Sequence, residues 1–582
     1  MSANDAPYRP LPAWYWLIER LWRVERALAE AKARRSDQDT PIRIFFVLVI
    51  FAAAFGALAV GAATRALSNA DERALYFSGA VERADLTDRN GQLLAVDLTH
   101  FGVYLDPREV WDAAETRRVL AAALPDVPAN RLERALRGEK RAYLTGGLTP
   151  QARQRLHDLG LPGVSFEEED KRVYPLGASA AHLVGFTDKG GQGLSGAELA
   201  LDELIREEGK KGRPVALSID MRVQAALEDE VQKAVAKHSA KGGIGVVTDV
   251  HTGEILGMAS APDFDPNQAG RSDPNGLTDR AAASVFEVGS IFKIFSVALA
   301  LDSGVVKVNS TIDARGGLHL GSRTIHDYHA ENRVMTIADV FIHSSNIGVA
   351  RLGLMAGPET LQRYYKDLGL LDPAEVELAE SAKPIVPRRW DDNAVTSSTF
   401  GHAVSITPLM MVQAMNAVFN GGEFIPLTIR KMEPGDRPKG KRVLRPETSR
   451  AMLDLMRLNV TGGTGGKANA PGLRVGGKTG SAEKAMGGRY VRDKLISSFA
   501  AVFPTDGPVE TKRYAVLIML DEPRGTPDTF GFATGGWTAT PAAGRVIDRI
   551  APFLEVRRAP PTPAELEKAR GGAAPAVVEE AR

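Results

Sequence analysis

Residues 287–301 read EVGSIFKIFSVALAL, and this apolar run predicts a buried helix that is entered through Gly289. Ser290 and Lys293 lie near its start, three positions apart, so they share a helical face and can meet at the buried end. A serine hydroxyl is a poor nucleophile at neutral pH, but a lysine kept neutral by desolvation or by a second cation can take its proton. S-x-x-K alone arises by chance in chains of this size and usually marks a solvated face. Here the apolar flanks bury the lysine, which favours a nucleophilic Ser290.

A second motif, Ser344-Ser345-Asn346, stands between two helical patterns at 337–342 and 347–354. We expect it on the turn between those helices, where taken singly it is typical of a helix cap. In a catalytic interpretation Ser344 relays protons between a lysine and the leaving amine. The Asn346 amide then holds a substrate carbonyl and the lysine.

A third motif, KTGS at 478–481, continues a strand-like pattern. An edge strand here can hold a peptide by strand addition, and Gly480 lets another backbone approach closely. Lys478 supplies positive charge, and Thr479 or Ser481 can bind a terminal carboxylate. The backbone N–H groups of Ser290 and Ser481 can form an oxyanion hole. The predicted substrate-binding residues are therefore Thr479, Gly480 and Ser481.

The same stretch formally matches a phosphate-binding loop, because residues 472–479 fit G-x-x-x-x-G-K-[ST]. Such a loop needs a buried strand before it and a helix after it. Residues 461–471 are instead a glycine-rich coil, and residues 481–488 are too interrupted by glycine for a firm helix. We therefore reject a nucleotide site.

Composition narrows the function classes further. The chain has 582 residues, of which 72 are basic and 72 acidic, so no net field favours nucleic acid. Cysteine is absent, which excludes disulfides, thiolate nucleophiles and cysteine-ligated metals. The ten histidines show no H-E-x-x-H cluster, so we expect no metal and no cofactor.

One segment predicts a membrane span. Ile44–Ala63 carries no charge over about 20 residues, enough to cross the hydrocarbon core once as a helix. Lys and Arg cluster before it, which predicts a cytoplasmic N-terminus with everything after it outside. A cleaved signal peptide is the alternative, but its apolar core is usually shorter and its basic leader short, which favours an uncleaved anchor.

The rest of the chain predicts two folded parts. A hairpin is expected around Arg89-Asn90-Gly91, followed by helical patches and a loop-rich stretch. Strands and helices then alternate from Val215 to about Leu554, which predicts an α/β (α+β) fold. The predicted boundaries are 1–43 cytoplasmic, 44–63 transmembrane, 64–76 linker, 77–212 accessory module, 213–556 catalytic domain and 557–582 disordered tail.

The three motifs in this order resemble the penicillin-binding protein and serine β-lactamase superfamily, and their joint occurrence is far more specific than any one of them. Four further stretches resemble the class B penicillin-binding proteins. They are 89–95, 172–185 (RVYPLGASAAHLVG), 193–202 and 246–267. Together they span roughly residues 80 to 550. Within the class the chain is most similar to the division-specific septal transpeptidases.

This resemblance implies a β-rich, elongated pedestal module and a transpeptidase domain with a central antiparallel sheet flanked by helices. It also implies a periplasmic D,D-transpeptidase of the inner membrane at the division septum. Ser290 would attack the penultimate D-alanine carbonyl of a stem peptide and pass the acyl group to an amine. β-Lactams would acylate the same serine. The implied partners are membrane lipid, a glycan polymerase of the SEDS family (FtsW) and other divisome proteins.

Three positions depart from the family pattern: Val288 replaces a proline, Ser481 a threonine, and Phe400-Gly401-His402 an aromatic-Gly-Tyr-Gly run. None of them removes a reacting group, but they alter the walls of the expected site.

Several alternatives share these motifs. A serine D,D-carboxypeptidase or β-lactamase differs only in using water instead of an amine to resolve the acyl-enzyme. An elongation-type transpeptidase differs in its cellular role. A non-enzymatic β-lactam sensor or divisome scaffold would bind without turnover. The accessory module and the anchor favour a synthetic enzyme, and the short cytoplasmic segment weighs against a sensor.

Overall fold

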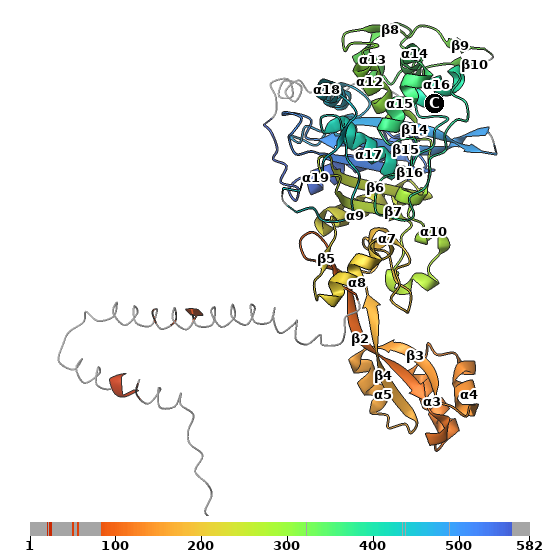
Figure 1. Cartoon of the computed structure of the whole chain (residues 1–582), viewed down its shortest axis with the longest axis vertical. Coiled ribbons are helices and arrows are strands. Elements are labelled where there is room, and N and C mark those ends of the chain that lie inside the picture. Colours follow the sequence, from red (N-terminus) through yellow and green to blue (C-terminus); the bar gives the residue numbers. More distant parts are fainter. Residues whose placement is uncertain are drawn as a thin grey trace, which may run out of the picture. The chain divides into compact units, whose positions relative to one another are not determined.

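The structure is a computed structural model of the chain, and it describes residues 83–560 except 322, 434, 437 and 488, together with a few positions before residue 57 (Figure 1). The chain divides into two compact units, Met1–Ala80 and Val81–Arg582, and the second contains every strand that the structure describes. Most of the predicted anchor Ile44–Ala63, of the segments flanking it and of the predicted tail lies outside the described residues. None of the helices within the described part is long and apolar enough to cross a membrane.

A sheet of five described strands forms the centre of the C-terminal part, and every neighbouring pair in it is antiparallel. In spatial order the strands are β14 (Gly476–Met486), β15 (Arg489–Phe503), β16 (Tyr514–Asp521), β6 (Gly242–Asp249) and β7 (Ile255–Ala261). The predicted central antiparallel sheet is therefore confirmed. Because β14 lies at one end of this order, its outer edge has no strand partner in the described chain.

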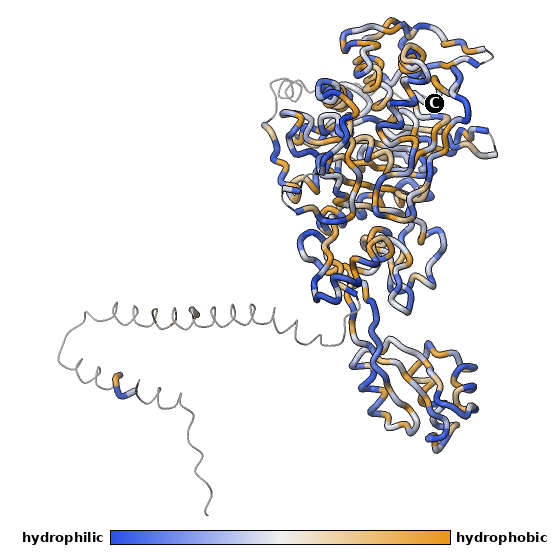
Figure 2. The backbone as a smooth tube through the Cα atoms, viewed as in Figure 1, coloured by the Kyte–Doolittle hydropathy of each residue, from blue (hydrophilic) through white to orange (hydrophobic). Residues whose placement is uncertain are grey.

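Helices cover both faces of this sheet (Figure 1), hydrophobic residues are frequent along the chain in this part (Figure 2), and every residue of strand β16 is buried. Its alternate residues enter two separate hydrophobic clusters, with Leu517 and Met519 in one and Val516 and Ile518 in the other. The helices in the first cluster are α12 (Lys293–Asp302), α17 (Pro408–Phe419) and α18 (Pro446–Gly462). Those in the second are α9 (Met221–Lys237) and α19 (Ala539–Ile550).

The N-terminal part is built on a second sheet. The predicted hairpin is confirmed, because β1 and β2 pair antiparallel across a turn in which Gly91 has φ +87°. The strands are β1 (Leu86–Thr87), β2 (Leu93–Leu105), β3 (Ala142–Leu148), β4 (Val164–Val173) and β5 (Val215–Ala216). Helices α3 (Ala113–Ala123), α4 (Ala129–Arg137) and α5 (Pro150–His157) match the predicted helical patches.

Two features of this sheet were not expected. Strands β3 and β4 lie where we predicted only helices and loops, because their charged and glycine-rich residues lack a clear alternation. The strand expected at 215–219 covers only two residues, and it pairs in parallel with β1 instead of opening the catalytic domain.

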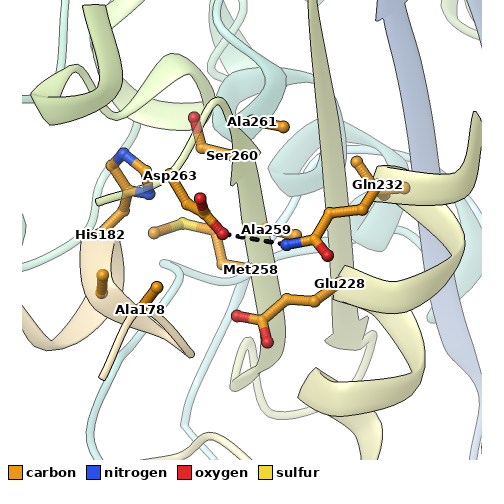
Figure 3. A pocket seen from close by; sticks show the side chains of 11 residues that line it. Ala178, His182, Glu228, Gln232, Met258, Ala259, Ser260, Ala261 and Asp263 are labelled. Atoms are coloured by element: carbon orange, nitrogen blue, oxygen red, sulfur yellow. Dashed lines mark hydrogen bonds between the residues drawn. The ribbon is translucent and has the colours of Figure 1, made fainter. Parts of the chain in front are cut away.

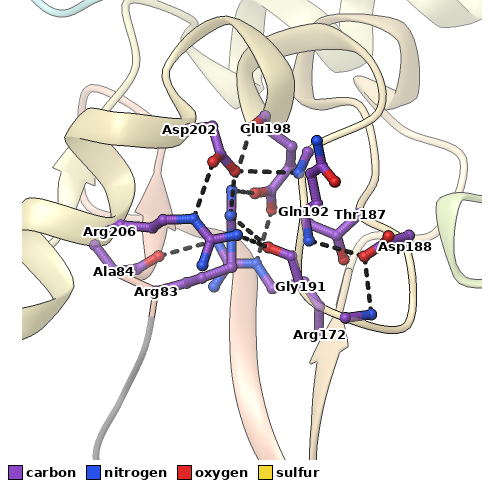
Figure 4. A network of polar contacts seen from close by, with 12 residues as sticks. Arg83, Ala84, Arg172, Thr187, Asp188, Gly191, Gln192, Glu198, Asp202 and Arg206 are labelled. Carbon is purple, nitrogen blue, oxygen red and sulfur yellow. Dashed lines mark hydrogen bonds and ion pairs between the residues drawn. The ribbon is translucent and has the colours of Figure 1, made fainter.

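Buried ion pairs hold this sheet to the helix that follows the 187–193 loop (Figure 4). Glu198 of α7 (Gly196–Ala200) is fully buried and accepts from Arg83 Nη2 at 2.5 Å and from Arg172 Nε at 2.7 Å. Arg172 of β4 also pairs with Asp97 of β2 at 3.0 Å, and Arg83 pairs with Asp202. Since removing one partner of a buried pair leaves an uncompensated charge, these contacts fix α7 to the sheet.

A small cavity between α9 and β7 is lined by His182, Glu228, Met258 and neighbouring side chains (Figure 3). Gln232 Nε2 donates to Asp263 Oδ2 at 2.9 Å across it. Glu228 accepts from Ser179 Oγ at 2.6 Å, and burial raises the pKa of its carboxyl. None of the three motifs lines this cavity, so it belongs to the packing of α9.

Candidate active site

The predicted nucleophile lies on a short 3-10 turn, η3 (Gly289–Phe292), which runs directly into α12. The sequence predicted one continuous α-helix, so the turn is tighter than expected. In a 3-10 turn residues three apart lie one above the other, which aligns Ser290 with Lys293. Gly289 has φ +60°, and a Cβ there would lie 2.8 Å from the Ser481 carbonyl oxygen. Glycine is therefore required for the turn to pack against β14.

Lys293 is completely buried, as its apolar flanks predicted. Its Nζ donates to the Ser344 carbonyl, to Ser344 Oγ at 3.0 Å and to Asn346 Oδ1 at 2.8 Å. None of these three acceptor oxygens belongs to a carboxylate, so a buried ammonium here would be costly.

The pKa of Lys293 is held well below its usual range. Burial is the largest cause, the positive charge of Lys478 adds to it, and the carboxylate of Asp327 opposes both. A lowered pKa favours the neutral amine, the form that can accept a proton from a serine hydroxyl.

Ser344 lies on the predicted turn between two helices, α13 (Ile337–Ile342) and α14 (Asn346–Ala356). Its φ of +56° is a left-handed conformation that non-glycine residues rarely adopt, and such strain concentrates at functional sites. Ser345 is the N-cap of α14 and accepts from Gly348 N at 2.9 Å. The capping interpretation is therefore correct for the middle residue of the motif.

The Ser344 hydroxyl accepts hydrogen bonds from both lysines, since Lys478 Nζ reaches it at 2.9 Å. Lys478 is also completely buried, on β14. With both lysines donating to its oxygen, the hydroxyl proton of Ser344 is free to point elsewhere. A chain of hydrogen bonds therefore joins Lys293, Ser344 and Lys478.

The KTGS motif lies on edge strand β14 and not on a loop before a helix, which confirms the rejection of a phosphate loop. Thr479 Oγ1 is 2.7 Å from Thr464 Oγ1, and Ser481 Oγ accepts from Gly535 N at 3.0 Å. The turn η3 packs against β14, so the structure brings Ser290 beside the residues predicted to bind substrate.

Two residues of the site were missed in the sequence. Asp327 accepts from Ile347 N at 2.9 Å and from Ser345 Oγ at 2.7 Å, so it supports the Ser344 turn and acts on the charge of Lys293. Thr464 comes from the glycine-rich coil at 461–471. Neither residue belongs to a regular spacing, and no local signal would have found them.

Gly480→Ala is expected to slow acylation of Ser290 by a β-lactam about 100-fold and to lower the free energy of unfolding by about 1–3 kcal/mol. A Cβ would lie 2.4 Å from Ser498 Oγ and 2.8 Å from the Val288 carbonyl oxygen. The second atom is backbone, so β14 and the turn before Ser290 must move apart. Fluorescent-penicillin kinetics and urea unfolding measure the two effects.

Gly466→Ala is the matched control, because the nearest atom to its added Cβ is 3.8 Å away. If Gly480→Ala acylates as fast as this control, the close approach of β14 to the turn is not needed for the reaction.

Comparisons with known proteins agree with this geometry. A family model described as penicillin binding protein transpeptidase domain matches residues 243–547, and one described as penicillin-binding protein dimerisation domain matches 78–212. A Caulobacter vibrioides protein named probable peptidoglycan D,D-transpeptidase FtsI is 56% identical over 556 residues, 94% of each chain. Peptidoglycan D,D-transpeptidase FtsI of Escherichia coli is 31% identical over 505 residues, 81% of this chain and 83% of that one.

Among solved structures, penicillin binding protein 3 from Mycobacterium tuberculosis, complexed with aztreonam, superposes with a TM-score of 0.64 at 26% identity. The match covers 83% of this chain and 98% of that one. The resemblance first read from the three motifs is thus confirmed over most of the chain. The chain belongs to the class B penicillin-binding proteins.

Proposed function

We propose that this chain is a peptidoglycan D,D-transpeptidase that cross-links stem peptides during septal wall synthesis through an acyl-enzyme on Ser290. The proposal rests on two buried lysines, Lys293 and Lys478, which both donate a hydrogen bond to the Ser344 hydroxyl. Lys293 follows Ser290 by one helical turn. The names of the relatives in Caulobacter vibrioides and Escherichia coli support the substrate and the pathway.

In the first half-reaction Ser290 Oγ attacks the penultimate D-alanine carbonyl, and neutral Lys293 takes the hydroxyl proton. The oxyanion is stabilised by the backbone N–H groups of Ser290 and Ser481. One such donor is worth about 2.7–4 kcal/mol of transition-state stabilisation. Ser344 then passes a proton to the departing D-alanine amine, because its hydroxyl bridges the two lysines.

Substrate binding depends on the free edge of β14. We infer that the stem peptide adds to this edge as an extra strand, as peptides do at exposed sheet edges. Lys478 and Thr479 bind the terminal carboxylate, and the Asn346 amide holds a backbone carbonyl. β-Lactams enter the same site and acylate Ser290.

In the second half-reaction an amine of a neighbouring stem attacks the ester and releases Ser290. The alternatives differ at this step, because water as acceptor would make the chain a carboxypeptidase or a β-lactamase. We further propose an accessory module at 77–212, a catalytic domain at 213–556 and a single anchor at 44–63 that places both outside the inner membrane. A SEDS polymerase, FtsW, and other divisome proteins are the proposed partners.

The test uses the full-length chain in detergent with a thioester analogue of the acyl donor and an added amine, and mass spectrometry of the products. We expect an amide product whose yield rises with amine concentration, together with a long-lived penicillin adduct on Ser290. Hydrolysis unaffected by amine would identify a carboxypeptidase, and rapid turnover of penicillin a β-lactamase. An absence of acyl-enzyme would overturn the proposal.

A further inference from the structure

A group of polar residues lies beside the nucleophile turn and has no part in the chemistry described so far. Gly289 N donates to the Gly401 carbonyl at 3.2 Å, which joins the turn to residues 400–403. Glu287, three residues before Ser290, accepts with one oxygen, Oε1, from Ala403 N at 2.8 Å and from the Tyr490 hydroxyl at 3.2 Å. The carboxylate therefore lies between the turn and the β14–β15 hairpin.

Two buried atoms of this group lack hydrogen-bond partners within the described part of the chain: Glu287 Oε2 and His402 Nδ1. Buried polar atoms in proteins are nearly always paired, so each unpaired atom needs an explanation. His402 contacts Tyr490, with ring centroids 5.5 Å apart, so the side chains that carry the two unpaired atoms both contact Tyr490. A carboxylate with a free oxygen beside an acyl-enzyme serine is suited to bind a cation.

The charges around the group agree with this role. Burial lowers the pKa of His402 to about 4, and the positive charge of Arg323 adds to the effect. The imidazole is therefore neutral at physiological pH and does not repel a cation. Arg323 donates to Ser397 Oγ at 2.5 Å, and its positive charge also acts on Glu287, where it opposes the effect of burial. Burial raises the pKa of Glu287, which makes its carboxylate a better proton acceptor than an exposed one.

Tyr490 donates to the carboxylate from the tip of the β14–β15 hairpin, outside the part of β15 that pairs with β16. Strand β15 pairs with β16 only from Ile496 onward, and the pairing of β14 with β15 shifts register after Glu483. Tyr490 lies beyond that shift and is 48% exposed. Displacing the hairpin tip would expose Glu287 and leave the pairing of β15 with β16 intact, although the Lys484 ion pairs to Asp521 and Glu522 would have to yield.

We propose that Glu287 is the binding site for the acceptor amine of the second half-reaction, with the Tyr490 hydroxyl occupying the place of the incoming ammonium until the hairpin tip opens. The inference rests on the proposed function and names the residue that distinguishes amine from water as acceptor. The ligand is an alkylammonium group at the end of a stem-peptide side chain.

The step is balanced in protons and bonds. The ammonium bound at Glu287 gives one proton to the carboxylate, and its nitrogen then attacks the ester carbonyl carbon of acylated Ser290. A C–N bond forms and the C–Oγ bond breaks. The second proton passes through neutral Lys293 to Ser290 Oγ, and Glu287 releases the first to solvent. The products are an amide, free Ser290 and one proton.

The test compares Glu287→Gln with the unmodified full-length chain, using the thioester donor and two acceptors at pH 7.5. One acceptor is an alkylamine, which is protonated at this pH, and the other is hydroxylamine, which is neutral. Glutamine keeps the acceptor oxygen for Ala403 N but removes the charge. We expect the alkylamine concentration for half-maximal transfer to rise about 10- to 100-fold, and that for hydroxylamine to change less than about 3-fold.

Two more variants keep the test decisive. Tyr490→Phe removes only the competing hydroxyl, so it should lower the half-maximal alkylamine concentration, and an unchanged or higher value would contradict the competition. Glu483→Gln removes a carboxylate of β14 that has no hydrogen bond to Tyr490 in the described structure, and it should match the unmodified chain. If Glu287→Gln raises the half-maximal concentration equally for both acceptors, or for neither, the assignment is overturned. A chain that forms no acyl-enzyme at all would instead contradict the proposed function.

Discussion

Ser290→Ala is expected to abolish covalent labelling by fluorescent penicillin, with a loss of about 10⁶-fold in the rate of acyl transfer. The hydroxyl is the only atom at the start of η3 placed to form an ester, and alanine leaves Lys293 with no proton to take. The turn itself should persist, because its geometry depends on Gly289 and not on the serine. Gel fluorescence after denaturation measures the adduct, and thermal unfolding checks the fold.

Ser303→Ala is the matched control, since Ser303 follows the same helix and its hydroxyl makes only a 3.4 Å contact with a carbonyl of the preceding turn. It should label like the unmodified chain. Covalent labelling that persists in Ser290→Ala at the rate of this control would assign the nucleophile to another residue.

The reacting groups could be predicted because each belongs to a short local pattern. Burial of Lys293 follows from apolar neighbours within one turn, and the turn at Ser344 follows from two flanking helical patterns. Strand β14 was harder, because GGKTGSAEKAM has little intrinsic preference for a strand. Its conformation comes from pairing with β15 along its whole length, which is a tertiary effect.

Contacts between distant segments could not be predicted from spacing. Tyr490 and Glu287 are 203 positions apart, and Asp327 reaches the Ser344 turn from a loop without periodicity. Strand β4 carries the charged run Glu167 to Lys171, which is typical of a loop, yet it pairs with β2 over its full length. In each case a contact with a distant segment of the chain determines the local structure. The local residue pattern of a single sequence does not predict which segment that is.

The sequence does not show whether Lys293 or Lys478 is the neutral lysine. The structure gives a reason to choose Lys293. Both amines are fully buried and both donate to the Ser344 hydroxyl, but it is Lys293 whose pKa is held well below its usual range, chiefly by burial. The charge of Lys478 lowers the pKa of Lys293 through this shared contact. Two adjacent cations would repel each other in a low-dielectric site, so one must lose its proton.

The rate of penicillin acylation is therefore expected to depend on pH through Lys293. Only the neutral amine can take the Ser290 proton, so the rate should be level above the pKa of Lys293 and fall about tenfold per pH unit below it. Lys478→Met removes a positive charge that lowers this pKa, so the pKa of Lys293 should rise. The acid limb, which is the pH range where the rate falls, should then move to higher pH. Lys293→Arg keeps a permanent cation and should lower the rate about 10²- to 10⁴-fold at every pH.

The position of the acid limb, measured as the pH dependence of the second-order acylation rate, separates this effect from the loss of substrate contacts in Lys478→Met. Lost contacts lower the plateau at all pH values, whereas a change in the pKa of Lys293 moves the limb along the pH axis. Lys307→Met, which removes an exposed lysine, should change neither. An acid limb at the same pH in Lys478→Met as in the unmodified chain would mean that the charge of Lys478 does not lower the pKa of Lys293.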